Sequence, residues 1–218
     1  MNRKVMVQSI VTIAIFFFIN FGLWEILVSN GISQEWASFI VYAVLFILVI
    51  LIWHKNLTKD WNRLREDVKS WKKFFCNLLI WIVTSFALAY LFQFLVSKNF
   101  ITTNTENMGK VASSIPPILS CIMMTIFGPV IEEITFRQSM IGFVPKHRKV
   151  FLIVMMIISV IIFDCIHLYR WQEFFYYLPL SIALTTFYVK YNKNIYSSIF
   201  MHSLLNLPGA ILLIIGVI

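Results

Sequence analysis

The sequence predicts an all-α protein: a polytopic membrane helical bundle of about seven transmembrane helices, with one further amphipathic helix on the inner membrane surface. Hydrophobic residues make up 60% of the 218 residues, and the mean hydropathy is +0.82, whereas soluble domains are about 45–50% apolar. The apolar residues form runs of about 20, the length that a helix needs to cross the hydrocarbon core. Glycine is sparse and phenylalanine abundant, which argues against the weak alternating pattern of a membrane β-barrel.

Seven apolar segments are long enough to be spans. The first follows Arg3 and Lys4, as in a signal peptide, but it is too long and no small-residue cleavage site follows, so we expect a retained helix. No repeat or second domain is visible, and the chain is interpreted as one membrane domain, 1–218. The predicted spans are 5–28, 36–53, 74–96, 117–142, 150–168, 172–189 and 195–217.

The basic residues are distributed unevenly between the connecting segments. Of the 18 Lys and Arg residues, 14 lie in the N-terminal tail and the loops on its side, three lie on the opposite side, and Arg137 lies within a span. Because Lys and Arg accumulate in cytoplasmic loops, this bias predicts a multi-pass protein of the cell membrane with a cytoplasmic N terminus. The net charge of +8 then reflects topology in the lipid bilayer, and no nucleic-acid partner is predicted.

Two connecting segments have patterns of their own. In 56–73, five apolar residues recur at three- and four-residue steps and charged residues fill the other faces, which predicts an amphipathic helix on the inner membrane surface. A solvated basic loop is the alternative. Residues 97–116 are polar and predict an external loop that Pro116-Pro117 ends. The five apolar residues are Leu57, Trp61, Leu64, Val68 and Trp71.

Three ionisable residues lie inside the fourth predicted span: Glu132, Glu133 and Arg137. A charge at bilayer depth costs from about 3 to above about 10 kcal/mol, so such residues pair or line a polar cavity. Glu133 and Arg137 are four residues apart and predict a buried ion pair. Glu132 is rotated by about 100° and is left free to contact water, near a bend predicted at Gly128-Pro129. The alternative is a structural ion network in a channel or transporter.

Two later spans carry further polar residues. His167 follows Phe163 by four residues, and His202 and Asn206 share one face of the last span. A lone intramembrane histidine is more often a helix–helix hydrogen-bonding group than a ligand, and an amide beside a histidine can fix its tautomer or hold an oxyanion. Together with the glutamates, the set is hard to explain as packing. Asp164 either orients the His167 imidazole or faces the cavity, and both alternatives stay open.

These side chains suit the attack of water on a peptide carbonyl. The sequence has neither a GxSxG nor an HExxH motif. Glu132 would accept the proton of the water while His167 helps to position it, and His202 and Asn206 would stabilise the tetrahedral oxyanion. In a second version Glu132, His167 and His202 bind a Zn²⁺ ion that activates the water. The sequence does not separate the two versions.

The order and spacing of these residues resemble the CPBP family, the intramembrane proteases of the CAAX-protease and bacteriocin-processing type, also called Abi proteins. The resemblance covers about 117–210, the expected catalytic core. It implies an all-helical membrane endopeptidase with Glu132 as base and with His167, His202 and Asn206 completing the site. Family members are often labelled metalloproteases, and other accounts describe a glutamate-dependent enzyme without a required metal. The motifs are Glu132-Glu133-x-x-x-Arg137, Phe163-x-x-x-His167 and His202-x-x-x-Asn206.

The resemblance suggests a peptide or membrane-protein substrate, and for a short chain that looks bacterial it suggests peptide maturation or bacteriocin immunity. Two other function classes stay open. One is a non-catalytic membrane scaffold or immunity protein, and the other is a small transporter that uses Glu132 and His167 for protons. Transporters often have paired, inverted halves, and no such symmetry is visible in this sequence.

Overall fold

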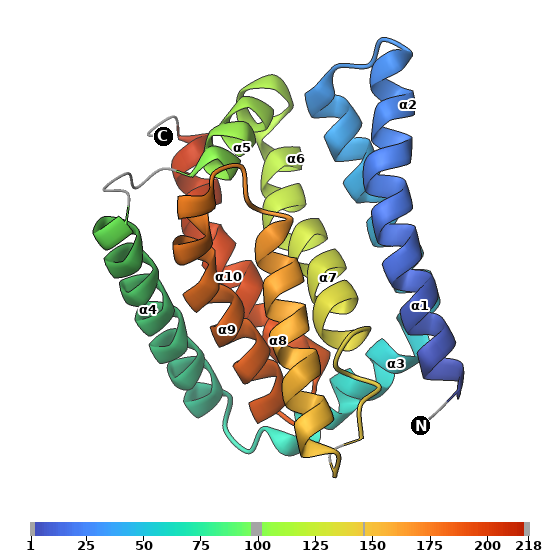
Figure 1. The fold of residues 1–218 in the computed structure, drawn as a ribbon, viewed down its shortest axis with the longest axis vertical. Helices are drawn as coiled ribbons and strands as arrows, with labels where there is room; N and C mark the ends of the chain where they lie inside the picture. The colour runs from blue at the N-terminus through green and yellow to red at the C-terminus, as the bar shows by residue number, and fades with distance from the viewer. Residues whose placement is uncertain (1–2, 97–101, 146, 216–218) are drawn as a thin grey trace.

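The computed structural model describes residues 3–96, 102–145 and 147–215, and within these ranges every regular element is a helix, so the predicted all-α class is confirmed (Figure 1). The labels η1 to η3 denote π-helical turns and η4 a 3₁₀ turn. The elements are α1 (Arg3–Phe18), η1 (Ile19–Leu23), α2 (Trp24–Ser29), α3 (Gln34–Asp67), α4 (Trp71–Val96), α5 (Thr103–Ser114), α6 (Pro117–Ile122), η2 (Met123–Phe127), α7 (Gly128–Glu132), η3 (Glu133–Gln138), α8 (Lys149–Cys165), η4 (Trp171–Glu173), α9 (Phe174–Lys190) and α10 (Ile195–Ile214).

Within the described residues, seven of the helical segments overlap the predicted spans. Among the described residues, five segments are long and apolar enough to cross a membrane. Helices α8 and α9 have 17 residues each, about 26 Å of helix, which is slightly less than a hydrocarbon core of about 30 Å. A multi-pass helical membrane protein is therefore confirmed, while the number seven and the side of the N terminus stay predictions. The five segments are Arg3–Ser29, Gln34–Asp67, Trp71–Val96, Pro117–Gln138 and Ile195–Leu213.

The segment Pro117–Gln138, made of α6, η2, α7 and η3, lies at the centre of the bundle. Figure 1 shows α7 between the α1–α3 pair on one side and α8 and α10 on the other. Of its apolar stretch 56% is buried inside the protein, against 11% for Arg3–Ser29. The segment that carries the predicted glutamates is therefore surrounded by protein rather than by lipid, which meets the condition for charged residues at membrane depth.

Helix α3 differs from the prediction at its second half. Residues 57–67 are helical, as the periodicity indicated, but they continue α3 instead of forming a separate surface helix. Leu57 and Leu64 are buried in the main core because they pack against the bundle. Helix α3 has 34 residues, and its second half, cyan in Figure 1, runs across the lower end of the bundle.

The predicted loop 97–116 is also partly helical. Residues 97–101 lie outside the described residues, but Thr103–Ser114 forms α5. The side chain of its N-cap residue, Thr102, accepts a hydrogen bond from the Thr105 backbone N–H. Val111 and Ile115 are buried beside Met123 and Ala210. Two apolar residues were too weak a pattern to predict this helix, which covers one end of α10.

Candidate active site

The central segment has one π-helical turn before α7, which ends at Glu132, and a second one directly after it. Gly128 donates its N–H to the Met123 carbonyl, five residues back, so the Met124 carbonyl loses the partner it would have in an α-helix. The next donor along the chain would be Pro129, which has no N–H. The Asn206 amide fills this gap and donates to the Met124 carbonyl at 3.0 Å. The predicted bend at Gly128-Pro129 thus appears as a shift from π to α geometry, tied to α10 by Asn206.

The predicted ion pair is present. Arg137 Nη1 lies 3.1 Å from Glu133 Oε1, and both side chains are completely buried. The Phe163 ring lies under the guanidinium, with the Arg137 Cζ atom 4.2 Å from the ring centroid. Arg137 Nη2 also donates to the Ser181 carbonyl at 3.5 Å. The guanidinium is therefore enclosed by residues of α8 and α9 as well as by its own turn.

His202 is oriented by Glu133. Its Nδ1 atom lies 2.9 Å from Glu133 Oε1. Because Glu133 is paired with Arg137 and acts as the acceptor, the proton of this bond lies on Nδ1, and Nε2 is the atom that faces Glu132. Among the described residues Asn206 makes no hydrogen bond to His202, so the idea that this amide fixes the tautomer was wrong. The carboxylate does so, in a geometry that recurs where an imidazole must be held.

His167 is oriented by the backbone. It follows the last turn of α8, which ends at Cys165. Its Nδ1 atom lies 2.8 Å from the Phe163 carbonyl, and since a carbonyl only accepts, Nδ1 carries the proton. The ring packs between the Phe163 and Tyr177 rings, with centroid distances of 4.7 and 5.2 Å. The Nε2 atom of His167 therefore also points at Glu132.

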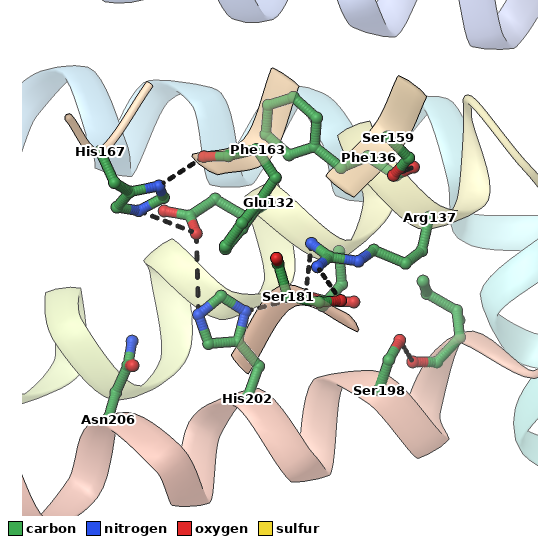
Figure 2. Close-up of polar contacts among 12 residues, drawn as sticks. Glu132, Phe136, Arg137, Ser159, Phe163, His167, Ser181, Ser198, His202 and Asn206 are labelled. Atoms are coloured by element: carbon green, nitrogen blue, oxygen red, sulfur yellow. Dashed lines mark hydrogen bonds and ion pairs between the residues drawn. The ribbon is translucent and has the colours of Figure 1, made fainter. Parts of the chain in front are cut away.

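Glu132 lies between the two imidazoles (Figure 2). Its Oε2 atom is 3.7 Å from Nε2 of His167 and 3.7 Å from Nε2 of His202. These separations are longer than a direct hydrogen bond, and within the described part of the chain Oε2 has no hydrogen-bond partner. The three side chains are 9%, 14% and 7% exposed in the order Glu132, His167, His202. The predicted convergence of three helical segments on one place is therefore observed.

The second version of the predicted mechanism needs a zinc site, and the donor atoms expected for such a site are present. Two imidazole Nε2 atoms and a carboxylate face one another, and each Nδ1 is held by an acceptor, as in many metal sites. Over residues 3–96, 102–145 and 147–215, however, no group of three or more His, Cys, Asp or Glu side chains is close enough to hold a metal ion as placed. Glu132, His167 and His202 are the residues that would hold the ion, and a zinc site stays a prediction.

Glu173 lies beside the site and was not predicted. Its carboxylate accepts hydrogen bonds from the backbone N–H groups of Thr103, Tyr169 and Arg170 at 2.6, 3.1 and 3.3 Å. Burial alone would raise the pKa of Glu173, but these hydrogen bonds outweigh it and hold the pKa below its usual range. The residue fastens the start of α5 to the connection that carries His167. A single acidic residue in a short loop gave no sequence signal for this role.

Comparison with known proteins gives one family and several relatives. Residues 114–208, which include all three motifs, match the family model described as type II CAAX prenyl endopeptidase Rce1-like. The family model and the relatives described below support a CPBP family protein. The family supports an intramembrane peptidase of the CAAX type. No solved structure matches the chain.

Three curated relatives are similar over much of the chain. The UPF0177 protein YxdF of Lactococcus lactis is 29% identical over 178 residues, covering 76% of this chain and 89% of that protein. The membrane-embedded CAAX protease MroQ of Staphylococcus aureus is 27% identical over 197 residues, covering 81% and 74%. The UPF0177 protein YbdI of Lactococcus lactis is 29% identical over 115 residues, covering 53% of this chain and 60% of YbdI.

Proposed function

We propose that this CPBP family protein is an intramembrane endopeptidase that hydrolyses a peptide bond with a water molecule activated by Glu132. The observation that carries the proposal is the position of Glu132 Oε2, which is buried, lacks a hydrogen-bond partner among the described residues and faces two imidazole nitrogens at 3.7 Å each. A water molecule at the side of this group of atoms can hydrogen-bond to both a carboxylate oxygen and an imidazole nitrogen.

The tautomers assign a role to each acceptor. In its neutral form His167 has its proton on Nδ1, toward the Phe163 carbonyl, so its Nε2 accepts a hydrogen bond. A water molecule can donate one hydrogen to His167 Nε2 and the other to Glu132 Oε2, which leaves its oxygen lone pairs free to attack. Glu132 acts as the general base and takes the proton of the water in the transition state.

The attack forms a bond between the water oxygen and the carbonyl carbon, and the carbonyl electron pair moves to its oxygen. His202 and Asn206 would stabilise this oxyanion. His202 donates from Nε2 in its doubly protonated form, while Glu133 Oε1 holds its Nδ1 at 2.9 Å. Asn206 contributes its second amide hydrogen, since one is donated to the Met124 carbonyl. Preorganised donors of this kind are commonly worth 10²–10³-fold in rate, about 3–4 kcal/mol each.

The tetrahedral intermediate then collapses. Its C–N bond breaks, the carbonyl reforms, and Glu132 returns the proton to the leaving amide nitrogen, so the products are a carboxylic acid and an amine. Glu133 and Arg137 touch no reacting atom in this scheme. They form the buried pair that holds His202, and their contribution is orientation and charge.

The substrate is a peptide or membrane protein whose scissile bond can reach a site enclosed by helices. Peptide maturation and bacteriocin immunity are the roles we propose for it. The relative MroQ is named a membrane-embedded CAAX protease, which favours a catalytic role over the scaffold and the transporter. Measuring zinc in the purified protein by mass spectrometry, for wild type and His167→Ala, tests the metal version. One zinc per chain that is lost in the variant would support it.

The proposal is tested by comparing the peptides that cells release when they express wild type or Glu132→Gln. Glu66→Gln, the same change at an exposed position on the charged end of α3, is the matched control. We expect specific cleavage products in wild type and Glu66→Gln that are absent in Glu132→Gln at equal protein abundance. Identical peptides in all three strains would refute the peptidase and favour a scaffold.

A further inference from the structure

The corner between α3 and α4 carries a cluster of lysines that the candidate active site does not use. Lys69 lies in the short connection between the two helices, and Lys72 and Lys73 lie in the first turn of α4. We call these three residues the corner lysines. Their side chains are exposed, and within the described part of the chain none of them forms an ion pair. Since like charges repel, an anion that binds among them is stabilised.

Helix α4 places this corner at the edge of the apolar layer. The helix runs along the outside of the bundle (Figure 1) and packs with one face against α9. It is one of the segments long and apolar enough to cross a membrane, so its outer face lies against the acyl chains of lipids. The exposed apolar residues of that face begin one turn after the corner lysines, which places the ammonium groups at headgroup level. These residues are Phe75, Leu79, Ile80 and Val83.

Two tryptophans indicate the same depth. Trp71, between the corner lysines, is partly exposed, and its ring centroid lies 6.4 Å from that of Trp61 of α3 and 6.0 Å from that of Phe75. Trp61 also packs edge-on against Tyr196 of α10 at 5.2 Å. Tryptophan is enriched at membrane–water interfaces, where the ring contacts the apolar layer and the N–H stays hydrated. The aromatic contacts therefore hold the corner rigidly at this level.

The other end of the bundle differs in charge. Around α2, α5 and the connection from α8 to α9, the described residues include more acids than cations, so a cluster like the corner lysines is absent there. The electropositive surface thus faces one leaflet of the bilayer. The charged residues at that other end are Glu25, Glu35, Glu106, Glu173, Lys110 and Arg170.

We propose that the corner between α3 and α4 binds an anionic phospholipid. The corner lysines hold its headgroup phosphate, and its acyl chains lie along the outer face of α4. A lysine ammonium binds phosphate as a point charge with three donors, and a basic cluster directly beside a spanning helix is typical of anionic-lipid recognition. The phosphate of a zwitterionic lipid is offset by its own ammonium group, so it is held less tightly. This binding does not depend on the proposed peptidase activity.

The test measures which lipid the purified protein retains. Protein in detergent is equilibrated with equal molar amounts of phosphatidylglycerol and phosphatidylcholine, and the bound lipids are counted by native mass spectrometry. We expect wild type to retain phosphatidylglycerol in preference. Because each cation beside an anionic headgroup strengthens binding about fivefold, the triple variant should lower the ratio of bound phosphatidylglycerol to phosphatidylcholine by at least about tenfold. The triple variant combines Lys69→Gln, Lys72→Gln and Lys73→Gln.

A matched control removes the same charge from the same end of the bundle but away from the corner. It combines Lys55→Gln, Lys59→Gln and Lys149→Gln, three exposed lysines at the second half of α3 and the start of α8. We expect this control to keep the wild-type lipid ratio. An equal loss in the control would show that the basic end attracts anions in general, and it would overturn the proposed site.

Two further outcomes would also overturn the proposal. One is a folded triple variant, with the wild-type melting temperature, that retains phosphatidylglycerol as well as wild type does. The other is release of the bound lipid by excess soluble glycerol phosphate, which would indicate a site for free phosphate instead of a lipid. Should the triple variant not fold, Lys72→Gln alone is expected to lower the ratio about fivefold, and an unchanged ratio in that variant contradicts the proposal.

Discussion

The segments Arg3–Ser29 and Pro117–Gln138 are both apolar helices interrupted by π-helical turns, yet only the second carries a polar site. In the first, Asn20 donates to the Phe16 carbonyl of its own helix. In the second, side chains from other helices supply the donors, Asn206 to Met124 and Ser159 to Phe136. A π-helical turn alone therefore does not make a site. The two segments differ in how deeply they are buried and in whether other helices supply their hydrogen-bond partners. In the second segment, these contacts hold the Glu132 carboxylate between two imidazoles.

The largest loss of activity is expected at Glu132, a buried carboxylate that has no counterpart in Arg3–Ser29. Glu132→Gln keeps the size of the side chain and removes the base, so we expect kcat to fall by about 10²–10⁴-fold while the melting temperature stays near that of wild type. Rate and thermal unfolding are measured on the same detergent-solubilised preparations. Glu25→Gln, in the outer segment, serves as the control and should match wild type in both.

The next effect concerns stability. Arg137→Ala leaves the buried Glu133 carboxylate without its ion-pair partner, and breaking such a pair costs about 3–5 kcal/mol. We expect a clear drop in thermal stability together with loss of activity, measured by unfolding of the purified variant. Normal stability of Arg137→Ala would show that the pair does not hold the centre of the bundle.

A smaller loss of stability is expected when the side-chain donor to a backbone carbonyl is removed, and the two π-interrupted segments can be compared in this respect. Asn206→Ala leaves the Met124 carbonyl without a donor in a buried place, at a cost of about 1–3 kcal/mol. Asn20→Ala removes only a bond within one helix at a partly exposed position and should cost less than about 0.5 kcal/mol. Equal losses of melting temperature in the two variants would contradict the importance of cross-helix partners.

The smallest effect is a pH dependence at Glu173. The pKa of this carboxyl is lower in the folded chain than in an unfolded one, so its contribution is present above the unfolded pKa of about 4.3 and is lost as the pH falls through the folded pKa. We expect the melting temperature of wild type to decline below about pH 4, and Glu173→Gln to decline less over the same range. Parallel curves for the two proteins would exclude Glu173 as the cause.

The sequence predicted those parts of the site that depend on local spacing. Glu133 and Arg137 pair because they are four residues apart, and the pair survives the change from α to π geometry. The meeting of Glu132 with His167 and His202 followed from the expense of buried polar groups, supported by the motif order. The bond of Asn206 to Met124 could not be predicted, because it depends on a carbonyl that is free only in this π-helical geometry.

Other features depend on tertiary packing and left no local pattern. Whether residues 57–67 lie on a membrane or continue α3 depends on what covers Leu57 and Leu64, and the periodicity is the same in both cases. The contact of Ser181 with Arg137 joins α9 to η3 through a backbone carbonyl, which every residue possesses.

The central claim is that Glu132, held between two oriented imidazoles, removes the proton from an attacking water. The most direct measurement is the rate of peptide cleavage by purified protein in proteoliposomes, wild type against Glu132→Gln, at equal folded concentration. The account predicts cleavage at one defined bond by wild type and a rate at least about 10²-fold lower for the variant. Cleavage of the same bond at the same rate by folded Glu132→Gln would contradict it.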